Sequence, residues 1–230
     1  MVLLEMLAVG LFCGAVCGYI QLVFVLRGMA RPERNFSEVP LGKFMLMEEP
    51  AYRDQLTWAQ GHGFIANSII ERHGRNLFGK TRISIGVWRS EKEKISLEVF
   101  AVGEGFLFEF TTEFEGGESL VTCNSASIHI LPMVPGHYRQ SFESTDPTAL
   151  LDRHRAAVVY LGEHMGLHVL WSGQSYLEVI FVAQRTRADY FRPFFLWALR
   201  ITPRMFGFQL IAHGKSVMEQ YPIGTKETMP

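Results

Sequence analysis

The residues that could support metal chemistry are few and scattered along the chain. His164 and His168 are four residues apart with Glu163 beside them, and two imidazoles at that spacing on one helix can bind one ion. A helix through this region is expected to end at Gly166, which would put the two rings out of register, and no third ligand is obvious. We therefore predict no metal site and no bound cofactor.

Acid–base candidates also have simpler explanations. His154 lies between two arginines, where a helix surface or boundary position is expected, and His62 lies between two glycines on a flexible turn. Glu98 and Glu109 alternate with apolar strand residues, so a solvated sheet face explains them better than paired catalytic carboxylates. The sequence contains no Walker loop, dinucleotide fingerprint, HExxH zinc motif or GxSxG nucleophile elbow. No catalytic residue is predicted.

The element on which the rest of the chain depends is the apolar run from Val2 to Leu26. A helix of about 25 residues is roughly 37 Å long, enough to cross a hydrocarbon core of about 30 Å. We expect residues 1–27 to form a single transmembrane anchor. One alternative is a cleaved signal peptide, but such a peptide has a positively charged N-terminal region, where this chain has Glu5. The other alternative is a buried helix of a soluble protein.

Three glycines in this run recur at every fourth residue, at Gly10, Gly14 and Gly18. Small residues at that spacing lie on one helix face and allow a second helix to pack closely. They predict a contact with a second copy of the chain or with another membrane subunit. The alternative is that they are ordinary glycines, which are common in membrane helices.

Three positive residues follow the run: Arg27, Arg31 and Arg34. No lysine or arginine precedes it. Because positive residues are retained on the cytoplasmic side, we predict that the N-terminus is outside and the C-terminal domain is cytoplasmic. Cys123 is the one cysteine after the anchor, which fits a reducing compartment.

Residues 190–211 are dense in aromatic side chains and carry three arginines. Aromatic rings beside basic residues are typical of the membrane interface, and a helix that packs its rings on the domain core is the alternative. With the arginines after the anchor, the predicted interface residues are Arg27, Arg31, Arg34, Arg192, Trp197, Arg200 and Arg204.

The remainder of the chain predicts a linker over residues 28–50, punctuated by prolines, and one soluble α+β domain over residues 51–225. Apolar residues at every second position between residues 64 and 131, with short polar or glycine turns, predict an antiparallel β-meander. Helices are expected over residues 51–60, 147–165 and 172–188, with a strand over residues 177–182 as the alternative to the third. Residues 132–145 are expected to form a loop. The row Phe106, Phe108 and Phe110 is expected in the core.

Several local features of residues 54–160 resemble an uncharacterised bacterial protein family of unknown function. They are a helix with a tryptophan that runs into Gly-Phe, a Thr-Cys-Asn segment at the end of the meander, and a Leu-Leu-x-x-His helix (Trp58, Gly63, Phe64, Thr122, Cys123, Asn124, Leu150, Leu151 and His154). The resemblance implies a fold and no activity.

The formal net charge of −1 argues against a nucleic-acid-binding protein that needs a broad basic face. Two functions remain. The first is a membrane-anchored accessory, assembly or scaffold subunit that acts through protein contacts, with membrane lipid and another membrane subunit or itself as partners. The second is a membrane-tethered enzyme or a lipid- or small-ligand-binding domain with an aromatic-lined pocket.

Overall fold

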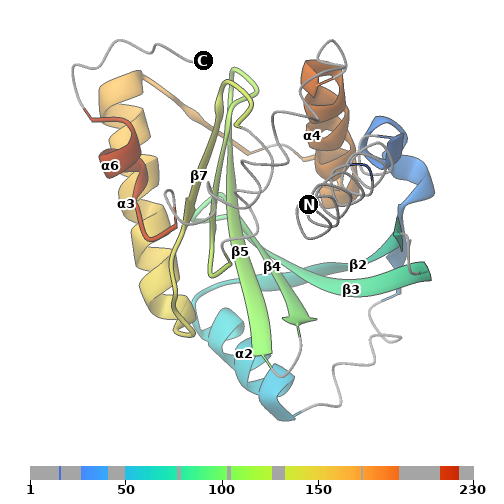
Figure 1. Ribbon diagram of the computed structural model, residues 1–230. Helices are drawn as coiled ribbons and strands as arrows, with labels where there is room; N and C mark the ends of the chain where they lie inside the picture. The colour runs from blue at the N-terminus through green and yellow to red at the C-terminus, as the bar shows by residue number, and fades with distance from the viewer. Residues whose placement is uncertain are drawn as a thin grey trace, which may run out of the picture.

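The computed structural model describes residue 16 and residues 27–40, 50–76, 79–102, 105–125, 133–171, 173–191 and 213–222. These residues form an α+β fold in which helices pack on both faces of a mostly antiparallel sheet (Figure 1). The predicted transmembrane anchor lies outside the described residues, apart from Val16 and Arg27. Within the described ranges, no helix is long and apolar enough to cross a membrane.

The sheet follows the order of the chain. Consecutive strands from β1 to β6 pair antiparallel, β7 pairs parallel with β6, and the short β8 pairs with the end of β5. This arrangement confirms the predicted meander. The strands are β1 (Phe36–Val39), β2 (Ile65–Asn76), β3 (Gly79–Ser90), β4 (Ile95–Val102), β5 (Gly105–Phe114), β6 (Ser119–Cys123), β7 (His137–Ser141) and β8 (Val169–Leu170).

The predicted turns join these strands. The polar residues 91–94 connect β3 to β4, and residues 115–118 connect β5 to β6. Gly117 has a φ of 88°, a left-handed conformation that glycine adopts without steric cost.

The helices are α2 (Pro50–Gly61), α3 (Pro147–Met165), α4 (Tyr176–Phe191) and the short α6 (Val217–Gln220), with a 3₁₀ turn η1 (Pro32–Arg34). The side chain of Asp146 accepts a hydrogen bond from the Thr148 amide at the start of α3, and Gly166 ends the helix with a φ of 68°. Both predicted ends of α3 are therefore confirmed. The helical interpretation of α4 is also confirmed over the strand alternative.

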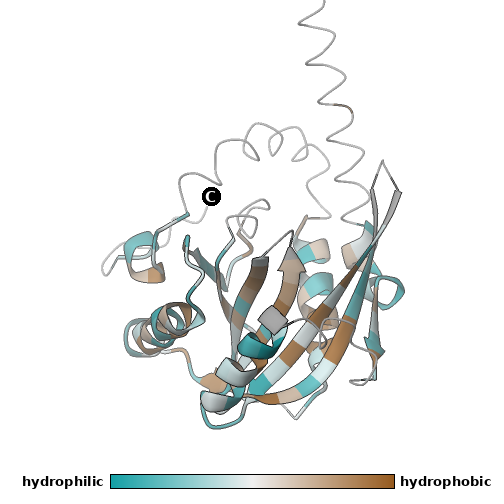
Figure 2. Cartoon of the chain, turned by 90° about the horizontal axis from the view of Figure 1, so that it is seen from below, coloured by the Kyte–Doolittle hydropathy of each residue, from teal (hydrophilic) through white to brown (hydrophobic). Residues whose placement is uncertain are grey.

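One face of the sheet packs against α2 and α3. Phe108 and Phe110 are buried there with Leu150 and Leu151 of α3, which confirms that the phenylalanine row belongs to the core. The strands in Figure 2 alternate between apolar and polar residues, as expected when each strand presents one side to this core.

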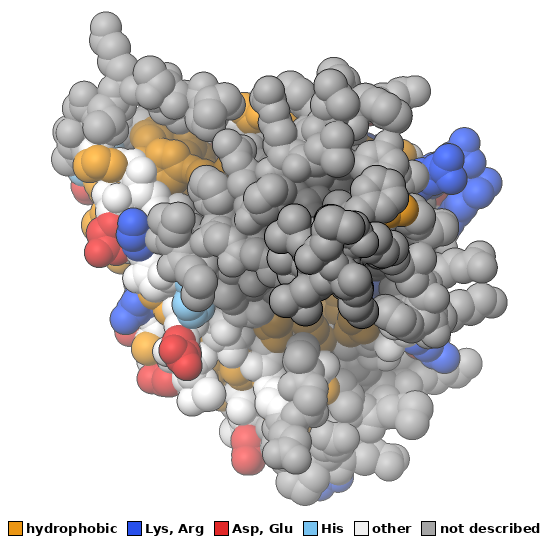
Figure 3. Space-filling model, viewed as in Figure 1, with side chains coloured by type: hydrophobic (Ala, Val, Ile, Leu, Met, Phe, Trp, Pro, Cys, Tyr) orange, Lys and Arg blue, Asp and Glu red, His pale blue; other side chains and the backbone are white. Residues whose placement is uncertain are grey.

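The opposite face packs against α4. Tyr176 and Val179 of α4 cover Ile70, Ile85 and Val87 of the sheet. The sheet is therefore covered on both sides at its centre. At the described part of the surface in Figure 3, acidic and basic side chains lie next to each other along one side.

Two predictions of irregular structure differ from the fold. The loop predicted over residues 132–145 is wrong for His137–Ser141, which form β7; all five residues are buried, and pairing with β6 stabilises a strand that has no apolar alternation. Residues 36–39, within the predicted linker, form β1 at the edge of the sheet because their backbone pairs with residues 69–72 of β2.

Candidate functional site

Two glutamates lie side by side at the centre of the face covered by α4. Glu98 of β4 and Glu109 of β5 are register partners, so their side chains rise next to each other from the same face of the sheet. Side chains opposite one another on antiparallel strands have Cβ atoms about 5 Å apart. Glu98 is 9% exposed, and Glu109 is half-buried. The prediction of a solvated sheet face is wrong for Glu98, because α4 covers it.

Burial changes how this carboxyl pair binds protons. It raises the pKa of Glu98 to about 8, with the neighbouring Glu109 carboxyl as the second cause. Burial also raises the pKa of Glu109. Two carboxylates on adjacent strands repel each other when both are ionised, so the pair retains a proton at neutral pH.

A tyrosine from α4 binds the pair directly. The Tyr176 hydroxyl donates a hydrogen bond of 2.6 Å to Oε1 of Glu98, and Tyr176 itself is 4% exposed. Burial raises the pKa of Tyr176 well above its ordinary value, and Glu98 raises it further. The hydroxyl therefore stays protonated, and it fixes the first turn of α4 to the middle of the sheet.

Three arginines oppose the effect of burial on the carboxyl pair. Arg72 of β2 and Arg187 of α4 lower the pKa of both glutamates, and Arg139 of β7 lowers that of Glu109. Arg139 is 4% exposed, and burial together with Arg187 lowers its pKa to about 10. Because the pKa of both glutamates is still raised, desolvation outweighs the attraction of the guanidinium groups.

Cys123 lies in the same register row as the two glutamates, opposite Glu109 on β6. Its thiol is buried, and burial raises its pKa above the ordinary range. The sulfur donates to the Ser125 carbonyl at 3.1 Å and accepts from the Ser125 amide at 3.3 Å. A buried thiol that stays protonated is a poor nucleophile, so Cys123 acts here as a packing residue.

The other face of the sheet has a hydrogen-bond network around His154. The ring bonds Thr112 through Nε2 at 2.9 Å and Thr122 through Nδ1 at 2.8 Å, and Thr122 also accepts from Gln140 at 2.8 Å. His154 is fully buried, and burial lowers its pKa to about 3. The expected surface or boundary position is wrong; a neutral His154 joins α3 to β5 and β6.

The remaining histidine candidates, His62, His164 and His168, do not come together in one site. The His62 ring lies against Trp58 with centroids 4.5 Å apart, and its Nδ1 is 2.8 Å from the Trp58 carbonyl oxygen. The helix that carries His164 ends before His168, as the sequence predicts. No group of three metal-binding side chains occurs in the part of the chain that the structure describes.

The segment after the predicted anchor packs on the domain. Contacts join α4 to η1 and to β1, and Arg185 of α4 forms an ion pair with Glu33 of η1. Arg27, Arg31 and Arg34, three of the predicted interface residues, are exposed on this segment. The other predicted interface and helix-packing residues lie outside the described residues: Gly10, Gly14, Gly18, Arg192, Trp197, Arg200 and Arg204.

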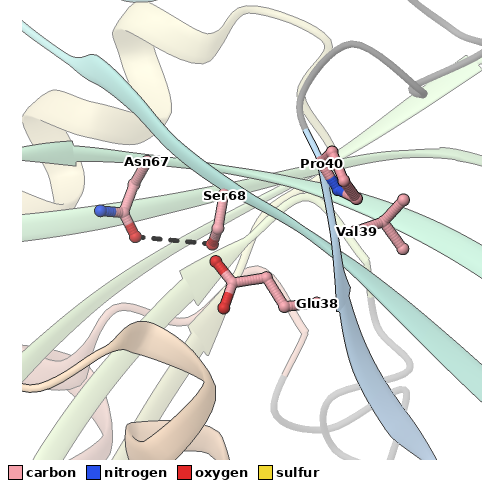
Figure 4. A pocket seen from close by; sticks show the side chains of 5 residues that line it. All are labelled: Glu38, Val39, Pro40, Asn67 and Ser68. Atoms are coloured by element: carbon pink, nitrogen blue, oxygen red, sulfur yellow. Dashed lines mark hydrogen bonds between the residues drawn. The ribbon is translucent and has the colours of Figure 1, made fainter.

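A shallow pocket of about 380 Å³ lies where β1 ends against β2. Its lining residues are Glu38, Val39, Pro40, Asn67 and Ser68, and Figure 4 shows the Glu38 carboxylate directed toward the Ser68 hydroxyl. The pairing of β2 with β3 skips Asn67 at a bulge. The pocket is small and open, with one charged side chain.

No protein-family model, curated protein or solved structure matches this chain. Its function must therefore be argued from its own residues. Sequence reasoning identified the positions of the two glutamates on the strands and missed their burial. The signal that could have found it is the apolar stripe of α4, which includes Tyr176 and needs a sheet face to cover.

Proposed function

We propose that this chain is a single-pass membrane protein with its N-terminus outside and its domain in the cytoplasm. It acts there as an accessory, assembly or scaffold subunit through protein–protein contacts. The observation that carries this proposal is the docking of η1 and β1, residues 32–39, on the domain. Because β1 belongs to the sheet and η1 contacts α4, the predicted anchor is followed by a fixed segment and not by a long flexible tether.

This direct connection suits a protein that transmits movements of its anchor to the domain, or that holds the domain at a fixed position on the membrane. A rotation or displacement of the anchor would reach the domain within a few residues, at Arg31 and η1. The exposed arginines of this segment are available to lipid phosphate, which attracts basic residues next to a membrane helix.

The burial of Phe108 and Phe110 favours this function over an aromatic-lined pocket. Phe108 is 2% exposed and Phe110 is fully buried among residues of α2 and α3. These rings cannot line an open ligand cavity while the core is packed in this way. They stabilise the body that the anchor holds.

The contact face of the anchor can be tested in the full chain. Gly14→Ile places a branched side chain on the predicted glycine face, and Ala8→Ile places one about 120° away from Gly14 around the same helix. We expect the glycine variant to lose cross-linking to its membrane partner or to a second copy, whereas the alanine variant keeps it. Equal cross-linking of wild type and Gly14→Ile in native membranes would overturn the proposed contact.

A further inference from the structure

The helix that covers the carboxyl pair also holds the membrane-proximal segment. Tyr176 at the start of α4 donates to Glu98, and Arg185 in the second half of the helix pairs with Glu33 of η1. Further contacts join α4 to β1. The sheet centre and the segment that follows the anchor are thus connected through one helix.

We propose that the Glu98–Glu109 pair is a proton-binding site through which pH controls how firmly α4 is held on the sheet. The two carboxyl groups are register partners on the face that α4 covers, and one of them is hydrogen-bonded by the helix. The docked helix excludes water from Glu98, and a hydrated Glu98 would ionise as an ordinary carboxyl group does. Proton release therefore favours undocking of α4, and docking favours proton uptake.

The charged and titratable groups that face the pair, among the described residues, all enter this balance. The arginine side chains favour the ionised form of Glu98 and Glu109. The other titratable side chains are buried and neutral. All these groups come from three strands and α4: Arg72 of β2, Cys123 of β6, His137 and Arg139 of β7, and Tyr176 and Arg187 of α4. Val87 of β3, the remaining neighbour in the register row, is apolar.

Arg187 is the group that most directly resists such a switch, because it belongs to α4 and is attracted to ionised glutamates. Its buried Nε has no hydrogen-bond partner in the described part of the molecule. The attraction is thus not completed by a hydrogen bond from that atom. The net effect of the surroundings favours the protonated form of both carboxyl groups. Rising pH therefore favours undocking of α4 in spite of the attraction of Arg187.

The expected magnitude follows from the two states of Glu98. Its pKa is about 8 under the docked helix and has an ordinary value of 4.5 in water. Between these values the undocking equilibrium rises about tenfold per pH unit, or about 50-fold from pH 6 to pH 8, and it levels off above that range. The device does not depend on the proposed partner contacts.

Hydrogen exchange of the full chain in lipid nanodiscs measures this equilibrium. After correction for the base-catalysed chemical rate, we expect exchange in residues 176–191 of α4 to rise about 50-fold from pH 6 to pH 8. Residues 147–165 of α3 should change little and serve as the internal reference. Glu98→Gln should remove most of the rise in α4, and Glu163→Gln, on the exposed side of α3, should keep it.

Two further variants keep the proposal testable if Glu98→Gln does not fold. Glu109→Gln removes a cause of the raised pKa of Glu98, so the rise in exchange should shrink and end at a lower pH. Tyr176→Phe removes the hydrogen bond between helix and pair, so α4 should exchange faster at pH 6. A parallel change in α3 and α4, or a full rise retained in either glutamine variant, would overturn the proposal.

Discussion

Glu98→Gln is predicted to stabilise the domain at alkaline pH while leaving it unchanged at acidic pH. The folded protein holds a proton on Glu98 up to a pKa of about 8, whereas the unfolded chain releases it near 4.5. Stability is therefore fully present below the unfolded pKa and is lost as pH rises through this window. Glutamine is neutral like protonated Glu98 and does not titrate.

The size of the effect follows from about 1.4 kcal/mol per pH unit for one proton. Between 4.5 and 8, the free energy of unfolding of the wild type falls relative to the variant by about 4 kcal/mol. His154 and His137 act in the opposite sense below their ordinary pKa of 6.5, because their pKa values are lowered in the fold. They are present in both proteins, so their contribution cancels in the comparison.

Urea unfolding of the full chain in detergent, followed by tryptophan fluorescence at a series of pH values, measures this difference. Glu163→Gln is the matched control, because it removes an exposed carboxylate from α3. We expect the stability of this control to follow the wild type at every pH. A constant difference between Glu98→Gln and wild type from pH 4.5 to pH 8 would refute the reasoning, since it would mean that Glu98 is ionised in the folded protein.

Three other substitutions test the packing that positions the site. His154→Phe should cost about 2–4 kcal/mol at pH 7, because it removes the ring that bonds two buried threonine hydroxyls and leaves Thr122 only its bond from Gln140; the cost should shrink by about 1.4 kcal/mol per pH unit below pH 6.5, since the wild-type ring resists protonation. Gly86→Ala should cost about 1–3 kcal/mol because its methyl group would collide with the Trp88 ring, whereas Gly61→Ala adds a methyl group in open space and should be near neutral. Asp146→Ala should cost about 1 kcal/mol by removing the cap of α3. Urea unfolding measures all of them, and equal stability of the Gly86 and Gly61 variants would contradict the close packing at Gly86.

Local signals were sufficient for much of the fold. The bounds of α3 follow from Asp146, Pro147 and Gly166, because a cap and a left-handed glycine act within a few residues. The meander follows from period-two apolarity and short turns. Both are properties of neighbouring residues, which a single sequence contains.

The features that the sequence did not reveal depend on long-range packing. The alternation of side chains along the strands places Glu98 and Glu109 on one face of the sheet. Only the position of α4 decides whether that face is exposed to solvent. His154 is flanked by arginines, yet its helix turns it toward two threonines that lie 32 and 42 residues away in the chain. The polar strand β7 forms because β6 is there to pair with it.

The central proposal is that residues 1–27 anchor this chain in a membrane and that the domain is attached directly to them. Membrane fractionation tests this most directly, by comparing the full chain with a form that lacks residues 1–27. The full chain should remain in the membrane pellet through an alkaline carbonate wash, and the shortened chain should appear in the soluble fraction. Release of the full chain by carbonate, or membrane retention of the shortened chain, would contradict the claim.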